Sequence, residues 1–309
     1  VENIARLRTA TRLIAAAKAA AGSRIGLIGE GVVPKFYDID ISPKDRAQIE
    51  RRYRIKFVNV PIQRLVDRAN SYPETAMRRA GTAFAKRFSQ VAVDQAALIK
   101  QARMLQAIRD LTREGRFASL AIRCWPELQS IYGAWPCPAI SALNDLGIPT
   151  ACEGDPGGAL DMLLAAQLTK TPTTLVDIVD WDERRNSLAI WHCGPTACSW
   201  ADKGARLLPH NVDGRAPNGR PALGLPGIVD LDFKPGKVSV FRTLGALDDE
   251  FVLEGQITRA PAQRICGSYG MLSRVKAYGL PVRMAAVREG IFTRALPHHY
   301  TAARGHLFS

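Results

Sequence analysis

The first third of the chain alternates between short apolar runs and longer amphipathic segments. The apolar runs SRIGLIGEG (23–31) and KFVNV (56–60) are typical of buried parallel strands. Around them, apolar residues recur at helical spacing. We expect helices over 1–21, 41–55, 61–70, 72–88 and 94–115. This alternation predicts a doubly wound parallel-sheet layer.

The middle third continues the alternation, with more polar groups at the strand ends. We expect strands in FASLAIRC, TACEGD, TTLVDIVDWD and NSLAIWHCGPT. Helices are predicted in PCPAISALNDLGIP and GALDMLLAAQLT, the first ending at a glycine. Functional groups of α/β sheets gather where strands end and loops begin, so we expect catalytic or binding residues at these strand ends.

The last third is predicted to be rich in strands. GKVSVFRTLG, EFVLEGQITRA, RICGSYGMLSRV and VRMAAVREGIF are read as strands joined by glycine and proline turns. The fold class is therefore α/β, with doubly wound parallel-sheet layers followed by a C-terminal antiparallel, barrel-like part. We divide the chain into a Rossmann-like domain (1–115) and a catalytic domain (116–309) whose barrel-like part starts at about residue 220.

Composition narrows the possible classes of protein. The 309 residues are 47 % hydrophobic and 23 % charged, and no apolar run is long enough to span a bilayer. The N-terminal segment lacks the apolar core of a signal peptide, and it is interpreted as a folded helix rather than a transit peptide. We expect a cytoplasmic protein that contacts no membrane.

The net charge of +13 raises the question of nucleic acid, but the 42 basic residues are spread along the chain without a recognised motif. A solvated basic surface is the preferred interpretation, with no nucleic-acid partner. The six cysteines form no CxxC pair, which argues against a zinc ribbon, so they are interpreted as reduced and buried. The first strand ends in GEG without a complete G-x-G-x-x-G, so a nucleotide cofactor is not expected.

Two carboxylates lie at predicted strand ends. Glu153 and Asp177 flank one strand–helix–strand unit. If a right-handed crossover makes the two strands neighbours, their equivalent ends bring the carboxylates together. Such a pair repels unless a cation lies between its members. Asp155 has a simpler interpretation, as the N-cap of the following helix.

Histidines supply the remaining candidates. His192 ends an apolar strand, and His298 and His299 form a pair near the end of the chain. A mixed oxygen and nitrogen site suits Mn²⁺, Co²⁺ or Mg²⁺ better than a thiolate-preferring metal. The alternatives are a hydrogen-bonded core position for His192 and a solvated turn for the pair. His210 and His306 are interpreted as structural.

The chain resembles the L-fucose isomerase and L-arabinose isomerase family, closest to its fucose-isomerase-like branch, in the segments CWPELQ, ISALNDLGIPTACEGDPGGALDMLLAAQLT, TLVDIVDWD, IWHCGPTA and PHHY. The resemblance spans roughly residues 20–309 and is strongest over 118–200. It implies a metal-dependent aldose–ketose isomerase that acts on an open-chain deoxyhexose or pentose, such as L-fucose, D-arabinose or L-arabinose, through an enediol. It also implies Mn²⁺ as the usual metal and a homo-oligomer, a trimer or a hexamer.

The resemblance also implies roles for single residues. Glu153 and Asp177 would be both metal ligands and acid/base groups, and His299 a metal ligand. His298 stands where the fucose branch has asparagine and is expected to contact the sugar, which leaves open which histidine of the pair is the ligand. His192 corresponds to a strand histidine of the arabinose branch that contacts metal or substrate.

Two tryptophans, Trp125 and Trp181, are expected to form walls of the sugar pocket. The family has an N-terminal domain before the segment that corresponds to 23–31, whereas about 20 residues precede that segment here, so we expect most of this domain to be missing. A truncated, catalytically impaired protein that still binds sugar or metal is therefore the alternative. A glycoside hydrolase would also use paired carboxylates but would need no metal-binding histidine.

Overall fold

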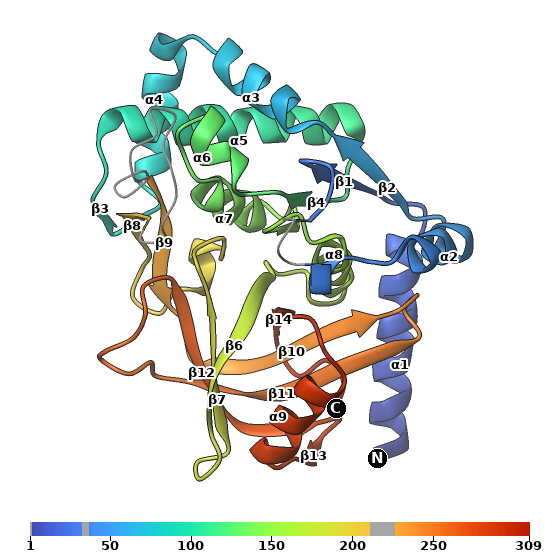
Figure 1. The fold of residues 1–309 in the computed structure, drawn as a ribbon. Coiled ribbons are helices and arrows are strands. Elements are labelled where there is room, and N and C mark those ends of the chain that lie inside the picture. Colours follow the sequence, from blue (N-terminus) through green and yellow to red (C-terminus); the bar gives the residue numbers. More distant parts are fainter. Residues whose placement is uncertain (1, 33–36, 211–225) are drawn as a thin grey trace.

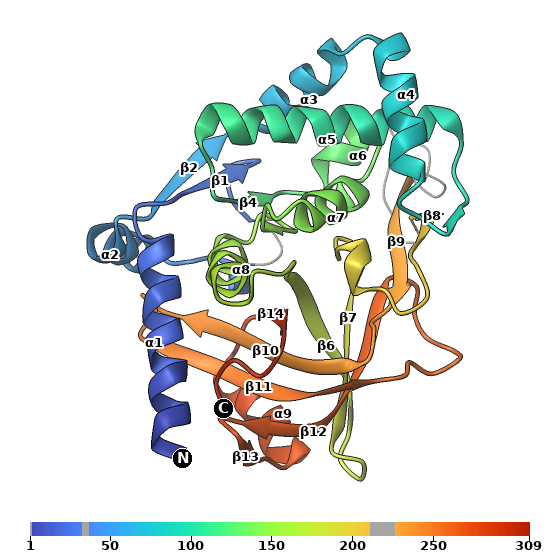
Figure 2. The same ribbon diagram turned by 180° about the vertical axis from the view of Figure 1, so that it is seen from behind.

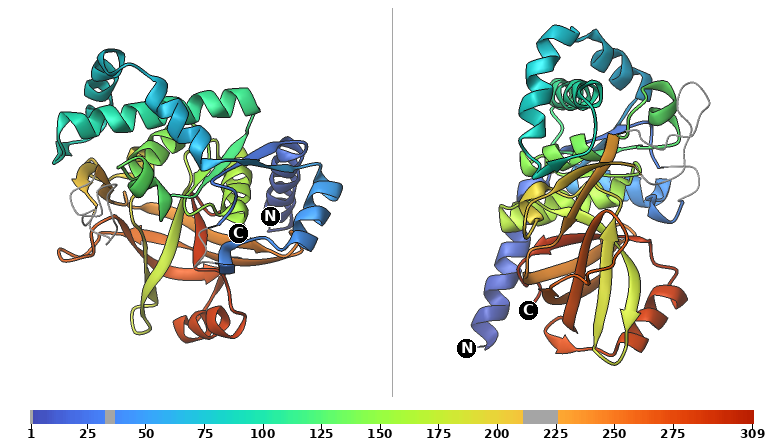
Figure 3. Two further views of the ribbon diagram at one scale, coloured as in Figure 1. Left: turned by 45° about the horizontal axis from the view of Figure 1, so that its top comes forward. Right: turned by 90° about the vertical axis from the view of Figure 1, so that its left-hand side faces the viewer.

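The computed structural model describes residues 2–32, 37–210 and 226–309. Figure 1 shows a helix-rich part above a strand-rich part, and the side views of Figure 3 show the two parts stacked on each other. Among the described residues, no helix combines the length and the apolar character that crossing a membrane requires.

The helix-rich part is built on a four-stranded parallel sheet. Its central strand β1 (Arg24–Ile28) pairs with β2 (Lys56–Val60) and β4 (Ser119–Ile122), and β4 pairs with β5 (Thr150–Ala151). All four residues of β4 are buried, as are the last four of β1. Continuous apolar runs are buried in this way when helices cover both faces of a sheet.

Helices do cover both faces. The layer on one side contains α3 (Ile62–Ser71), α4 (Glu74–Ala85), α5 (Gln95–Gly115), α6 (Glu127–Ile131) and α7 (Cys137–Asp145). The layer on the other side contains α1 (Glu2–Ala20), α2 (Pro43–Tyr53) and α8 (Pro156–Thr169). α1 packs on α8 and extends from the helix-rich part along the side of the barrel (Figure 2). The doubly wound prediction is confirmed.

The strand-rich part is a closed antiparallel barrel. Its strands follow the order β11-β10-β14-β6-β7-β12, and pairing of β12 with β11 closes the ring. They are β6 (Thr174–Asp182), β7 (Ser187–His192), β10 (Gly236–Leu244), β11 (Asp249–Thr258), β12 (Ser268–Ala277) and β14 (His299–Arg304). The additional elements are β3 (Gln90–Val91), β8 (Arg206–Pro209), β9 (Pro226–Asp232), β13 (Leu280–Pro281), α9 (Met284–Thr293), η1 (Tyr37–Ile39) and η2 (Cys198–Trp200). The predicted barrel-like part is confirmed.

Two local predictions are wrong. The strand that carries Asp177 does not lie beside β5 in the parallel sheet, because β6 pairs antiparallel with β14 and β7 in the barrel. Its second half is partly exposed, most at Val179 and Asp180, which antiparallel strands tolerate and parallel strands rarely do. The segment VRMAAVREGIF contains the helix α9, in which Met284 and Val287 are buried at helical spacing.

The barrel begins earlier in the chain than residue 220, since β6 and β7 are part of it. The domain division at residue 115 stays a prediction. Strands from both sides of that position, β1 and β4, pair in one sheet.

A buried ion pair joins the two parts of the fold. Asp155, at the start of α8, accepts hydrogen bonds from Nη1 and Nη2 of Arg242 on β10 at 2.7 and 2.9 Å. The Arg242 guanidinium also donates to the carbonyl of Ile39 at 3.1 Å. Both charged side chains are almost completely buried. Burial alone would raise the pKa of Asp155, but the charge of Arg242 and a hydrogen bond from His299 hold it well below its usual range.

The sequence around Asp155 makes room for this pair. Asp155 also accepts the N–H of Gly158 at 2.7 Å and so caps α8, as predicted. A Cβ atom at Gly157 would lie 2.5 Å from Nη2 of Arg242, and one at Gly158 would lie 2.5 Å from Oδ2 of Asp155. The two glycines after Pro156 therefore allow the guanidinium to reach the helix start.

Replacing Asp155 by alanine should lower the free energy of unfolding by about 3–5 kcal/mol, because it leaves Arg242 buried without a counter-charge. The matched control is Asp94→Ala. Asp94 caps α5 by accepting the N–H of Ala97 at 2.8 Å but is exposed and has only the capping role, so its loss should cost about 1 kcal/mol. Urea unfolding followed by circular dichroism measures both. Equal losses would contradict the structural role assigned to the pair.

A second buried carboxylate predicts a pH dependence. Asp161 on α8 accepts hydrogen bonds from the backbone N–H (3.0 Å) and the hydroxyl of Thr243, and burial raises the pKa of Asp161 to about 7. Between this value and the ordinary value of 3.8, the folded protein binds a proton that the unfolded chain releases. This group therefore lowers stability as the pH rises through that window, by up to about 1.4 kcal/mol per pH unit.

Asp161→Asn removes this titration. The difference in unfolding free energy between the variant and the wild type should therefore shift in favour of the variant as the pH rises from about 4 to 7. Urea unfolding at several pH values measures it, with the exposed Asp180→Asn as control for changing a carboxylate to an amide. Parallel pH profiles for wild type and Asp161→Asn would contradict the prediction.

Candidate active site

Glu153 is held in a strained turn. β5 ends at Ala151, and the chain turns through Glu153 (φ 58°) and Gly154 (φ 72°) before α8 begins. The N–H of Gly154 donates to the carbonyl of Ile122 at 3.0 Å. A Cβ atom at Gly154 would lie 2.1 Å from the carbonyl oxygen of Gly31, so only glycine permits this approach. A left-handed backbone is costly at a glutamate, and such strain is concentrated at functional positions.

Asp177 and His299 face each other across two barrel strands. They are direct partners in the register of β6 and β14. His299 Nε2 lies 3.9 Å from Oδ1 of Asp177 and 3.6 Å from Oε2 of Glu153. The structure thus brings together the three residues that the sequence analysis proposed as metal ligands. It does so through the barrel, not through the predicted crossover between parallel strands.

The imidazole of His299 is oriented by Asp155. Nδ1 of His299 lies 3.0 Å from Oδ2 of Asp155, and the ring is completely buried. With Nδ1 paired to a carboxylate, Nε2 is the nitrogen that faces Glu153 and Asp177. Histidines that bind metals usually have this arrangement, in which the second nitrogen donates to a carboxylate.

Among the described residues, three buried polar atoms at this position have no hydrogen-bond partner: Oδ1 of Asp177, Nε2 of His192 and Nε2 of His299. Such atoms are rare in folded proteins unless something else satisfies them. One donor atom from each of the three residues lies within 4.8 Å of the others, and the same holds for Glu153, His298 and His299. The donor set is carboxylate and imidazole, which fits a divalent metal of the Mn²⁺ type.

His298 differs from its neighbour in its contacts. Nδ1 lies 2.7 Å from Oδ2 of Asp38, Nε2 lies 3.3 Å from Oε2 of Glu153, and the side chain is 32 % exposed. Burial alone would lower its pKa, but the hydrogen bond to Glu153 and the nearby Asp177 and Asp38 carboxylates raise it to about 9. Both nitrogens of His298 lie within hydrogen-bond distance of carboxylates, whereas Nε2 of His299 forms no hydrogen bond within the described part of the chain.

The two carboxylates influence each other. Burial raises the pKa of Asp177, His192 and His299 act in the opposite direction, and the negative charge of Glu153 adds to the rise. A positive charge between Glu153 and Asp177 would relieve this repulsion.

His192, at the end of β7, lies on the other side of His299, with 5.1 Å between the ring centroids. Nδ1 of His192 lies 2.8 Å from the backbone nitrogen of Cys193 and 3.3 Å from its sulfur. If Nδ1 accepts the Cys193 N–H, the neutral ring carries its proton on Nε2, which then points a donor at the site. This geometry suits a substrate contact at least as well as a metal ligand.

A cavity of about 160 Å³ adjoins these groups. Its lining combines three tryptophans with carboxylate, imidazole and thiol groups. The lining residues are Cys124, Trp125, Trp135, Cys137, Glu153, Asp177, Trp191, His192, Cys193 and His210. Trp125 lines this cavity, and its role as a wall of a sugar pocket stays a prediction.

Trp181 is not brought to this cavity. A bulge in β6 between Ile178 and Asp180 shifts the alternation of side chains, so Asp177 and Trp181 face different sides. Trp181 stacks on Phe292 of α9, with 6.2 Å between the ring centroids. Strict alternation along TTLVDIVDWD gives no sign of this bulge.

Several residues near the site were not among the predicted ones. Trp135 and Trp191 line the cavity, and His210, interpreted as structural, stacks on Trp135 at 3.9 Å. Trp191 lies within the segment IWHCGPTA and Trp135 directly precedes PCPAISALNDLGIP, so their positions could have suggested both as cavity residues. Nothing in the local sequence indicates that Asp38 reaches His298, because 260 positions separate the two.

Comparison with known proteins adds the following. No family model matches the chain. It is 34 % identical over 194 residues to a sulfoquinovose isomerase of Clostridium sp. (strain MSTE9). The aligned region covers 61 % of this chain and 41 % of that protein. It is 30 % identical over 239 residues to the sulfoquinovose isomerase of Alkalicoccus urumqiensis, covering 77 % of this chain and 51 % of that protein.

A sulfoquinovose isomerase of Priestia aryabhattai is 33 % identical over 125 residues. The chain thus spans about half or less of the length of these curated relatives. Their names agree with the resemblance to sugar isomerases but not with the finer assignment to L-fucose or L-arabinose isomerase. The chain is similar to sugar isomerases of the fucose and arabinose isomerase-like kind.

Proposed function

We propose that this chain carries the metal-binding active site of an aldose–ketose isomerase. The observation that carries the proposal is the buried Nε2 of His299, which lacks a hydrogen-bond partner and faces two carboxylates while Asp155 holds Nδ1. The similarity to sulfoquinovose isomerases supports the reaction class. The substrate would be an open-chain sugar; sulfoquinovose joins L-fucose, D-arabinose and L-arabinose as candidates.

We assign Glu153, Asp177 and His299 as the metal ligands, with Mn²⁺ as the first choice and Co²⁺ or Mg²⁺ as alternatives. His299 is preferred over His298 because both nitrogens of His298 lie within hydrogen-bond distance of carboxylates, whereas Nε2 of His299 forms no hydrogen bond with the described residues. When bound, a divalent cation would supply positive charge that polarises the sugar carbonyl and stabilises the enediol-like transition state.

The residues of the chain would move the protons. Isomerisation transfers one proton between C1 and C2 of the sugar and a second between the two oxygens. Glu153 comes from the β5–α8 turn and Asp177 from β6, so the two carboxylates reach the cavity from different elements. One carboxylate would transfer the proton between C1 and C2, and the other would transfer the proton between the two oxygens.

His192 and His298 would bind hydroxyl groups of the sugar, and Trp125 would form part of the wall. Aromatic rings around the cavity exclude water, which strengthens every electrostatic interaction inside. The proposed assembly is a homo-oligomer. Because the chain covers only part of its relatives, binding of metal or sugar without turnover is the second candidate function.

Metal binding is tested by thermal unfolding of the wild type with EDTA and then with Mn²⁺, Co²⁺ or Mg²⁺. A ligand at 100 times its dissociation constant stabilises by about 2.7 kcal/mol, so the midpoint should rise clearly with Mn²⁺. Glu153→Gln, which removes one ligand charge, should abolish the rise. Asp180→Asn, on the same strand as Asp177 but exposed, should keep it. Absence of any metal-dependent rise in the wild type would contradict the proposed site.

Catalysis is tested by exchange of the C2 proton of the candidate aldoses with deuterated water, followed by NMR. The wild type with Mn²⁺ should exchange the proton of its substrate, and Glu153→Gln should reduce exchange to background because a proton carrier or metal ligand is lost. Exchange that persists in Glu153→Gln would contradict its assignment. A wild type that binds Mn²⁺ but exchanges none of these sugars would instead support the binding function.

A further inference from the structure

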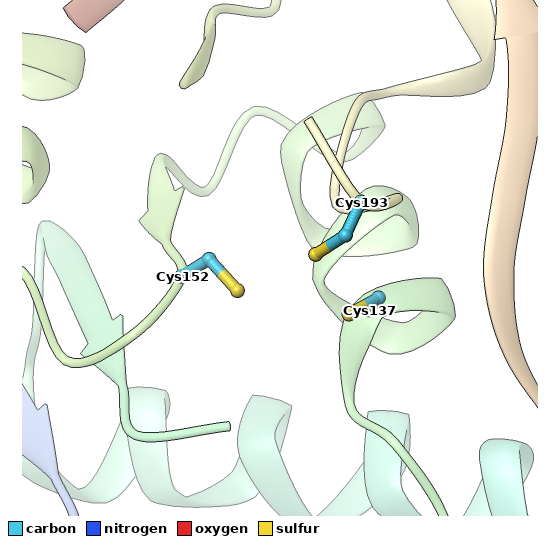
Figure 4. Close-up of side chains that lie close together, drawn as sticks. All are labelled: Cys137, Cys152 and Cys193. Atoms are coloured by element: carbon cyan, nitrogen blue, oxygen red, sulfur yellow. The ribbon is translucent and has the colours of Figure 1, made fainter. Parts of the chain in front are cut away.

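The cavity beside the proposed active site has a second cluster of metal-ligating groups. Cys137, Cys152 and Cys193 point toward one another from three separate segments (Figure 4). One sulfur atom from each lies within 4.8 Å of the others, and all three cysteines are free. Cys137 begins α7, Cys152 follows β5, and Cys193 follows β7. The three cysteines are far apart in the sequence, so no CxxC motif indicates the cluster.

The surroundings add further soft ligands. Cys124 lines the same cavity as Cys137 and Cys193, and Nδ1 of His192 lies 3.3 Å from the sulfur of Cys193. Cys137 and Cys152 are fully buried. Buried cysteines often serve only as small apolar side chains. Three thiols that converge from different elements, with a fourth thiol and an imidazole beside them, go beyond that role.

The dimensions suit a tetrahedral metal site. A zinc–thiolate bond is about 2.3 Å long, which places sulfur atoms about 3.8 Å apart around the metal. Sulfurs within 4.8 Å of one another reach this arrangement with small side-chain movements. Thiolates select soft or borderline ions such as Zn²⁺ and Cu⁺, whereas the carboxylates of Glu153 and Asp177 favour Mn²⁺.

We propose that Cys137, Cys152 and Cys193 form a thiolate site for a soft metal ion, distinct from the carboxylate–histidine site. The three thiolates would leave one position of a tetrahedral site for a further ligand. Binding of Zn²⁺ replaces the thiol protons, which pass to the buffer, and no oxidant or reductant is required.

The two sites are linked through the backbone. Cys152 immediately precedes Glu153, and Cys193 immediately follows His192. Any backbone movement that accompanies metal binding by these thiols would therefore also move Glu153 and His192. Zn²⁺ in the thiolate site should weaken Mn²⁺ binding in the carboxylate–histidine site; this consequence rests on the proposed function, whereas the thiolate site itself does not.

The test uses the full chain, kept reduced and freed of metal, and Co²⁺ and Zn²⁺ as probes. Co²⁺ bound by several thiolates gives an intense sulfur-to-metal charge-transfer absorption in the near ultraviolet, which a carboxylate–histidine site does not give. We expect the wild type to show this band and to lose it when one equivalent of Zn²⁺ is added. Equilibrium dialysis with metal analysis gives the stoichiometry.

Cys193→Ser, at a half-buried position, should reduce the band strongly, and Cys137→Ser should do the same. Cys266→Ser, a cysteine outside the cluster, is the matched control and should keep it. Glu153→Gln should also keep the band while losing the Mn²⁺-dependent thermal shift, which separates the two sites. The intensity of the wild-type band reports the number of thiolates, so the test does not depend on the folding of any variant.

Absence of the band in the wild type, or a band that survives in both Cys137→Ser and Cys193→Ser, would overturn the proposal. Loss of the band in Glu153→Gln alone would show that the thiolates do not bind Co²⁺ independently of the carboxylate–histidine site and would overturn the proposal as well. A missing Mn²⁺ shift in a wild type that shows the band would count against the proposed function but not against the thiolate site.

Discussion

The carboxylate of Asp155 connects the parts of this fold more than any other described group. It caps α8, pairs with the buried guanidinium of Arg242 on β10, and holds Nδ1 of His299 on β14. A buried charge is tolerated only when its partners satisfy it, so the helix start and two barrel strands must keep their relative positions. The same requirement fixes the ring orientation of His299. Packing of the two parts and orientation of the site therefore have one physical cause.

The site lies where loops of the parallel sheet meet the barrel. The β5–α8 turn supplies Glu153, whereas β6, β7 and β14 supply Asp177, His192 and His299. Neither part alone contains the complete set of carboxylates and imidazoles. The arrangement agrees with the general tendency of α/β sheets to place functional groups beyond the ends of their strands. It also explains the left-handed turn at Glu153, which aims a carboxylate at the barrel at some cost in backbone energy.

The carboxylate–imidazole groups and the thiol cluster contain residues that are neighbours in the sequence. Glu153 and His192 belong to the carboxylate and imidazole groups, and Cys152 and Cys193 belong to the thiol cluster. Divalent metals differ in their preference for these donors, so the two proposed sites would select different ions. The turn before α8 carries Cys152 of the thiol cluster and Glu153 of the carboxylate–imidazole groups. A backbone shift at this turn would therefore displace both.

The sequence by itself determined the classes of structure and the chemical candidates. Apolar periodicity is a local property, and it indicated the parallel layer, most helices and the C-terminal barrel. Residue types at predicted strand ends singled out Glu153 and Asp177, and the resemblance to sugar isomerases added His299 as a ligand. Local pattern failed where two secondary structures compete, as in α9, whose alanine, methionine and charged residues favour a helix.

Only the tertiary structure decided how these residues meet. Glu153 and Asp177 converge because β6 joins the barrel, and one bulge in β6 turns Trp181 away from the cavity. Arg242 reaches Asp155 across 87 positions, and Asp38 reaches His298 across 260. The three clustered thiols also come from separate segments. Such contacts depend on how whole elements pack, and no short stretch of sequence contains the information that specifies them.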